Sequence, residues 1–360
     1  MNSKIKNILL LIITIAIFIL FMETTARIIL YFFPEAVCST FSDPNDVFLC
    51  RLESQLSKSL ERYNQTTVHY NHDICDKWDA QLGWIPKPNC RSPQYSTNSQ
   101  GFRGTNEFKL EKNRRRIALI GDSFTWGENN LDEETYSFYL YEIFNENADI
   151  INMGVHGYGP EQSYIYFMRD GLKYKPDTVI FGLFLPVIHR TILKVRDFFK
   201  PRFIIENGAL KLDPDSSRIP DLKTAMLMSS EVKKKSRFYS LSFLYGSYNK
   251  FIRMATSYND EVTVTLKIIE ELNKQLKKEN IELIVLLIPE QEMVEKDNAD
   301  YYGVVPKITM NLEKNNIGYI NLQPVFEEYY QSNNQSLYKG HLKPIGNRII
   351  ANELFKSLGK

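Results

Sequence analysis

Apolar runs alternate with amphipathic stretches along the chain from residue 116 onward. Continuous apolar runs at 116–120, 148–152, 177–185, 281–288 and 318–322 predict strands that are buried on both faces. Helical spacing of apolar positions predicts helices at 134–147, 160–172, 261–278, 308–315 and 344–358. This alternation predicts an α/β fold in which helices cover both faces of a parallel sheet.

Residues 1–33 have a different pattern. Lys4 and Lys6 precede an apolar run at 8–22, which only Thr14 interrupts before Glu23. The pattern predicts an uncleaved signal anchor, that is, a single transmembrane segment with a cytoplasmic N-terminus and an exported body. A cleavable signal peptide is the alternative, because small residues follow at 24–26.

Residues 34–112 lack clear periodicity and are expected to form an extracytoplasmic lead-in. All four cysteines of the chain lie here: Cys38, Cys50, Cys75 and Cys90. An even number of cysteines in an exported segment predicts two disulfides, whose pairing stays open. A zinc site with His69 and His72 is the alternative, although the spacing has no CxxC pair. Phe102 and Arg103, later in this segment, are expected to pack at the surface.

Charge and motifs exclude several classes of function. The chain has 44 basic and 43 acidic residues, so its formal net charge of +1 does not indicate a nucleic-acid partner. It has no P-loop, zinc signature or dinucleotide fingerprint, and we therefore predict neither a cofactor nor a metal.

The first core strand leads directly into Gly121, Asp122 and Ser123. This turn would place a hydroxyl at the carboxyl end of the sheet, where open α/β sheets carry their sites. Ser123 can then act as a nucleophile if a base reaches it. The alternative is an ordinary helix N-cap formed by Asp122 or Ser123.

Together with two later blocks, this turn resembles the SGNH (GDSL-type) hydrolases, in particular membrane-anchored bacterial members. Asn152-Met153-Gly154 resembles the second block of that family, and Gly340-His341-Leu342 resembles the last. The resemblance implies a flavodoxin-like three-layer α/β/α domain at 113–360, with strand order 2-1-3-4-5. It also implies Ser123 as nucleophile, His341 as base, and the amides of Ser123 and Gly154 as oxyanion donors.

Two parts of the family pattern are missing. The family asparagine that donates to the oxyanion falls at Pro186 or Val187, neither of which has a side-chain donor. His189 or Arg190 is a candidate replacement. A second interpretation of the two gaps is a site that binds without turnover.

The family aspartate, two or three residues before the histidine, falls at Tyr338 or Lys339. Glu290 or Glu292 is a candidate source of the missing carboxylate, and a Ser123–His341 dyad without one is the alternative. Asp122 is expected to be a buried hydrogen-bond partner that shapes its turn. His156 is expected at the surface of a loop.

An insertion at 190–259 follows the third core strand and is rich in aromatic residues. It leaves from the edge of the sheet that carries the site, so a lid or a substrate platform is expected.

These features predict an extracytoplasmic serine esterase or acyl-transfer enzyme. Location and resemblance indicate acyl groups on cell-envelope carbohydrate or lipid as the substrate. The alternative is a non-catalytic binding or assembly protein of the envelope with the same fold.

Overall fold

The computed structural model describes residues 3–32, 75–196, 198–221, 223–225, 227–228, 258–296 and 303–359. Backbone contacts divide the chain into two compact units: Met1–Thr67 with Pro220–Ser257, and Val68–Ile219 with Tyr258–Lys360. The second unit contains the sheet and the predicted catalytic and oxyanion-donor residues. Most of the predicted insertion beyond Ile219 lies outside the described residues, so the predicted lid stays a prediction.

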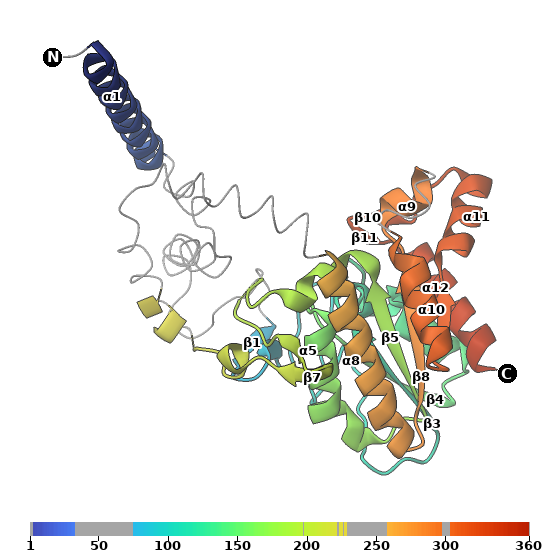
Figure 1. Ribbon diagram of the computed structural model, residues 1–360. Coiled ribbons are helices and arrows are strands. Elements are labelled where there is room, and N and C mark those ends of the chain that lie inside the picture. Colours follow the sequence, from blue (N-terminus) through green and yellow to red (C-terminus); the bar gives the residue numbers. More distant parts are fainter. Residues whose placement is uncertain are drawn as a thin grey trace. The chain divides into compact units, whose positions relative to one another are not determined.

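The core of the second unit is a five-stranded parallel sheet (Figure 1). Its strands are β3 (Arg115–Gly121), β4 (Ala148–Gly154), β5 (Thr178–Phe184), β8 (Glu282–Ile288) and β9 (Gly318–Asn321). Their spatial order is β4-β3-β5-β8-β9, and each neighbouring pair is parallel. The predicted α/β class and the 2-1-3-4-5 order are confirmed.

Helices cover the two faces of this sheet. α4 (Tyr136–Ile143), α11 (Gln323–Asn333) and α12 (Pro344–Leu358) share one hydrophobic cluster with Ile117 and Leu119 of β3. α5 (Pro160–Tyr166) and α8 (Tyr258–Lys278) lie side by side (Figure 1), with α10 (Val304–Lys314) next to α8. Because strand side chains alternate between faces, each apolar strand can contribute to both layers.

Several short elements were not predicted. They are α3 (Ser123–Trp126), α9 (Gln291–Glu295), and the hairpins β1 (Asp76–Asp79) with β2 (Gly83–Pro86), β6 (Phe203–Glu206) with β7 (Ala209–Leu212), and β10 (Tyr338–Lys339) with β11 (His341–Leu342). A 3₁₀ segment at Leu185–Ile192 follows β5. Elements this short give no periodic pattern, and α11, which was also missed, is too polar to show one clearly.

The N-terminal segment forms helix α1 (Ser3–Phe32). In the part of the chain that the structure describes, no helix has the length and apolar character needed to cross a membrane. The predicted N-terminal span therefore has no support from the described residues.

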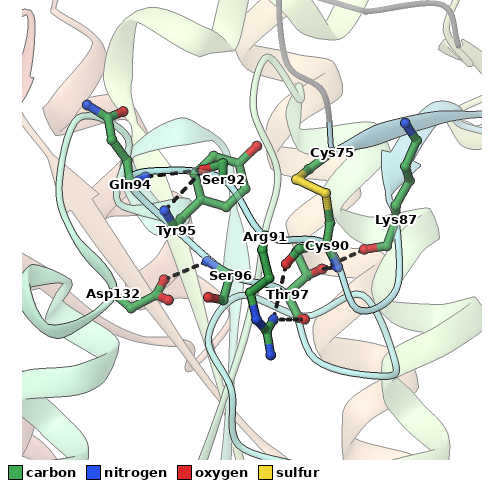
Figure 2. Close-up of a disulfide and its surroundings, with 10 residues drawn as sticks. All are labelled: Cys75, Lys87, Cys90, Arg91, Ser92, Gln94, Tyr95, Ser96, Thr97 and Asp132. Carbon is green, nitrogen blue, oxygen red and sulfur yellow. Dashed lines mark hydrogen bonds between the residues drawn. A yellow bond between two sulfur atoms is a disulfide. The ribbon is translucent and has the colours of Figure 1, made fainter.

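A disulfide joins Cys75 to Cys90, where the described part of the lead-in begins (Figure 2). Near it, the Thr97 hydroxyl accepts from the Cys90 amide at 2.9 Å and donates to the Lys87 carbonyl at 2.6 Å. One of the two predicted disulfides is confirmed, and the bonded Cys75 and Cys90 cannot serve as zinc thiolates. Cys38 and Cys50 lie outside the described residues.

Phe102 and Arg103, in the described part of the lead-in, are buried, contrary to the predicted surface packing. Phe102 is buried against Tyr166 and Tyr174, with ring centroids 6.5 Å and 5.5 Å away. Arg103 Nε donates to Asp132 Oδ1 at 2.7 Å. The prediction was wrong because this segment has no periodic pattern that would show which of its side chains are buried.

Candidate active site

A row of three glycines lies across neighbouring strands near the carboxyl edge of the sheet. Gly121 of β3 lies opposite Gly154 of β4 and Gly182 of β5. A Cβ at Gly121 or Gly182 would lie 2.2 Å from Thr125 Oγ1, and a Cβ at Gly154 would lie 2.3 Å from the Trp126 amide nitrogen. The glycines therefore allow the short helix α3 to lie directly on the strand ends.

Asp122 and Ser123 occupy the turn between β3 and α3. The Asp122 side chain caps the helix by accepting from the Phe124 amide at 3.0 Å, as the predicted structural role requires. Burial raises the pKa of the Asp122 carboxyl to about 6, against the opposing effect of the Arg190 charge. Ser123 is buried, and its amide donates to no described residue, so it can donate to a ligand.

The hairpin β10–β11 carries His341. Asn130, which is 3% exposed, ties this hairpin to the segment that follows α3. Its Nδ2 donates to the carbonyls of Glu128 and Leu342, each at 2.9 Å. This clamp joins two segments that are more than 200 residues apart in the sequence.

His341 Nε2 lies 2.9 Å from Ser123 Oγ. The imidazole ring also packs against Phe124, with centroids 5.0 Å apart. Burial lowers the pKa of His341 below its usual value. A neutral imidazole with a lone pair on Nε2 can accept the Ser123 proton, which is the contact that a nucleophile and its base require.

Three polar side chains surround His341 that the sequence analysis missed or dismissed. Asn129 Nδ2 lies 3.2 Å from His341 Nδ1. Glu128 Oε2 lies 3.8 Å from His341 Nε2 and 2.9 Å from Nδ1 of His156. His156 is 6% exposed, so its predicted place at a loop surface is wrong. The signal for Glu128 and Asn129 was their position directly after the nucleophile helix.

Gly154 does not present a free amide to the site. Its N–H donates to its own neighbour, Asn152 Oδ1, at 3.0 Å, and its Cα packs on α3. The loop after β4 offers Gly157 instead, with φ +73° and no hydrogen bond from its amide to a described residue. The predicted oxyanion role of Gly154 is therefore not supported, and the second glycine of the GVHGYG loop is the better candidate.

Of the two candidate replacements for the missing asparagine, only one lies beside the turn that carries Ser123. His189 is turned back on its own segment, where Nδ1 donates to the Pro186 carbonyl. Arg190 instead approaches the nucleophile turn: Nη1 lies 3.8 Å from Asp122 Oδ2 and donates to the Tyr158 carbonyl at 3.1 Å. Burial lowers the pKa of Arg190, and its Nε has no hydrogen-bond partner among the described residues.

Glu290 does not reach His341. It is the N-cap residue of α9, and burial with the nearby Glu292 charge raises its pKa. Neither glutamate makes a hydrogen bond or ion pair with His341 in the described part of the chain. Tyr338 donates its hydroxyl to the Pro289 carbonyl at 2.8 Å, and Lys339 is exposed, so neither replaces the missing aspartate.

No cluster of three or more potential ligands among the described residues would hold a metal ion. The site is thus assembled from Ser123, His341 and their hydrogen-bonding neighbours. The contact between Ser123 and His341 is one that can activate a serine, and the amides of Ser123 and Gly157 donate to no other described residue.

No protein-family model and no curated protein matches this sequence. Among solved structures, an acetyl xylan esterase has 15% identity and a TM-score of 0.42, over 67% of this chain and 98% of that one. A catalytic mutant of an acetylxylan esterase from Geobacillus stearothermophilus has 13% identity and a TM-score of 0.41, over 70% and 97%. A lipase/acylhydrolase from Enterococcus faecalis has 12% identity and a TM-score of 0.41, over 68% and 95%.

The chain's own features are more specific than these overall values. The Gly-Asp-Ser turn ends the first core strand, the Asn-Met-Gly block ends the second, and the Gly-His block follows the last. The strand order and the contact between Ser123 and His341 join these blocks at one edge of the sheet. In its ordered blocks, its sheet and its serine–histidine pair, the chain is similar to the SGNH (GDSL-type) hydrolases.

Proposed function

We propose that this protein is a serine hydrolase or acyltransferase that acts on ester-linked acyl groups. The observation that carries the proposal is the 2.9 Å contact between Ser123 Oγ and His341 Nε2. Two structural facts support it: the buried turn presents Ser123 at the strand ends, and burial keeps the pKa of His341 below its usual value. A base with a lowered pKa is neutral, and so able to accept a proton, at physiological pH.

The reaction has two halves. Ser123 Oγ attacks the ester carbonyl carbon while its proton passes to His341 Nε2. The bond from this carbon to the leaving oxygen then breaks, and His341 gives the proton to that oxygen. Water, or the hydroxyl of an acceptor, attacks the acyl-enzyme in the same way, and the proton that His341 takes from it returns to Ser123 Oγ.

The oxyanion that forms in each half needs donors. The Ser123 and Gly157 amides are the backbone candidates, because neither donates to another described residue. Arg190 is the side-chain candidate in place of the missing asparagine, because its Nε has no partner and its guanidinium lies beside the nucleophile turn. One such donor typically stabilises the transition state by about 3 kcal/mol.

We propose an extracytoplasmic location and, as substrate, acyl groups on cell-envelope carbohydrate or lipid near the membrane. The Cys75–Cys90 disulfide supports the location, because disulfides persist in oxidising compartments. The apolar run at 8–22 after two lysines is consistent with export. The substrate class follows from this location and from the family resemblance.

Covalent labelling of the full-length protein with a fluorophosphonate probe tests the proposal. We expect Ser123→Ala to abolish labelling and His341→Ala to slow it about a thousandfold or more. Ser217→Ala and His189→Ala are the matched controls, since Ser217 is exposed and His189 bonds to its own segment. Both controls should label at the wild-type rate.

Failure of the folded wild-type protein to label would contradict the enzyme proposal. The same failure would favour the non-catalytic binding alternative, because Ser123 would then lie beside a histidine that does not activate it.

A further inference from the structure

The far nitrogen of His341 has a partner that no family block supplies. Asn129 presents its side-chain amide to His341 Nδ1 at 3.2 Å, in the place where a carboxylate would orient the ring. Resting on the proposed function, we infer that Asn129 is the positioning residue of this site and completes a Ser123–His341–Asn129 triad. Asn129 holds the ring by a neutral hydrogen bond and neither gains nor loses a proton.

The direction of this hydrogen bond decides whether His341 can be a base. If Oδ1 of Asn129 accepts from Nδ1–H, the lone pair of the ring lies on Nε2 and faces Ser123. If Nδ2 donates to Nδ1, the proton lies on Nε2 and the ring can only donate to Ser123. A half-turn of the terminal amide exchanges the two atoms at the same place, so both states are sterically available. In the inferred triad, the active enzyme has the first orientation, in which Oδ1 of Asn129 accepts from Nδ1–H of His341.

The backbone around Asn129 is fixed by the end of α3 on one side and by Asn130 on the other. Gly127 ends α3 with φ +84°, and Asn129 itself has φ +65°. Next to it, the side-chain amide of Asn130 donates to the carbonyls of both Glu128 and Leu342. Asn129 is therefore held between the nucleophile helix and the histidine hairpin, where its side chain has a short path to His341.

A purely structural explanation exists for an asparagine at this position. Asparagine tolerates positive φ better than most residues, and the turn needs a residue that does. The two explanations make opposite predictions for glycine, which adopts this backbone more easily still but has no side chain. They also differ for aspartate, which tolerates the same backbone and adds a carboxylate.

The experiment compares Asn129→Gly and Asn129→Asp in the full-length protein by the rate of fluorophosphonate labelling. We expect Asn129→Gly to slow labelling about tenfold, the usual effect of losing one orienting hydrogen bond. Asn316→Gly is the matched control, since Asn316 is an exposed asparagine with φ +50° in another turn. Labelling of Asn129→Gly within about twofold of wild type would overturn the inference.

The pH profile of Asn129→Asp gives a second readout. The charges that act on His341 are Glu128, which raises its pKa, and His156, Arg190 and Arg196, which lower it. An added carboxylate at Nδ1 favours the imidazolium and raises this pKa. We therefore expect Asn129→Asp to label at least as fast as wild type at high pH. The fall in its labelling rate at low pH, the acid limb of the profile, should move to higher pH. An unmoved acid limb would contradict direct contact with the ring.

Nitrogen-15 NMR of the five histidines separates this inference from the enzyme proposal. His341→Ala assigns the His341 signals. We expect the Nδ1–H tautomer of His341 in the wild-type protein and a loss of this preference in Asn129→Gly, even if the protein fails to label. An Nε2–H tautomer in the wild type would overturn the inference whatever the labelling result.

Discussion

Two polar clusters lie at the carboxyl end of the sheet, and they differ in charge. On the side of the insertion, the Glu161 carboxylate and the Lys200 ammonium form an ion pair with both side chains fully buried. On the side of the hairpin, Ser123, His341 and Asn129 form a chain of neutral hydrogen bonds. The first cluster joins α5 to the segment that contains Lys200, and the second carries the proton transfer of the proposed reaction.

The charged cluster also holds Arg190 in place. Lys200 Nζ donates to the carbonyls of Arg190 and Leu193 at 3.0 Å and 2.9 Å. Burial raises the pKa of Glu161 and lowers that of Lys200, and each charge opposes the shift of the other. Removing one partner of a buried ion pair leaves an unpaired buried charge and strongly lowers the free energy of unfolding, whereas losing one neutral hydrogen bond lowers it less. Variants of the first cluster should therefore change stability, and variants of the second should change activity.

The largest expected effect is on the ion pair. Lys200→Met leaves the Glu161 carboxylate buried without its cation, which typically costs 3–5 kcal/mol, so we expect about 4 kcal/mol less free energy of unfolding. Urea denaturation measures this. The double variant Glu161→Gln, Lys200→Met is the matched control and should recover most of the loss. Equal losses in the single and double variants would contradict the comparison.

An intermediate effect is expected at the clamp. Asn130→Ala removes the donor for the Glu128 and Leu342 carbonyls, at a cost of about 1–3 kcal/mol. Because the clamp joins the turn to the hairpin, we expect slower fluorophosphonate labelling as well as a lower thermal midpoint. Asn333→Ala, which removes an exposed bond to the Tyr329 carbonyl, should change neither. A stability loss with unchanged labelling would place Asn130 outside the functional cluster.

The smallest effect is expected from Glu128→Gln. The Glu128 carboxylate raises the pKa of His341, so its removal should lower this pKa. His341 is active when neutral, and the acid limb of the labelling profile should therefore move to lower pH. The shift should be small, because the Glu128 side chain is 36% exposed and water screens its charge. Glu133→Gln, at an exposed glutamate, is the control; a shift to higher pH would refute the assignment.

Sequence periodicity determined the framework of the protein. The apolar runs identified all five core strands, and the helix at 344–358 was predicted with the bounds that α12 has. Because a parallel sheet brings the carboxyl ends of its strands together, the Gly-Asp-Ser turn also located the candidate nucleophile, Ser123. The partnership of Ser123 with His341 followed from ordered blocks and is now seen as a direct contact.

Only the tertiary structure decided the neighbours of that pair. Gly154 was expected to donate, yet its amide donates to Asn152 Oδ1. Glu290 or Glu292 was a candidate partner of His341, and Asn129 lies there instead. Local patterns report which face of an element is buried, since burial has the period of the element. They do not report which side chains meet when 212 residues separate them, as they separate Asn129 and His341. That contact depends on three features together: the positive φ of Asn129, the short hairpin β10–β11 and the buried side-chain amide of Asn130.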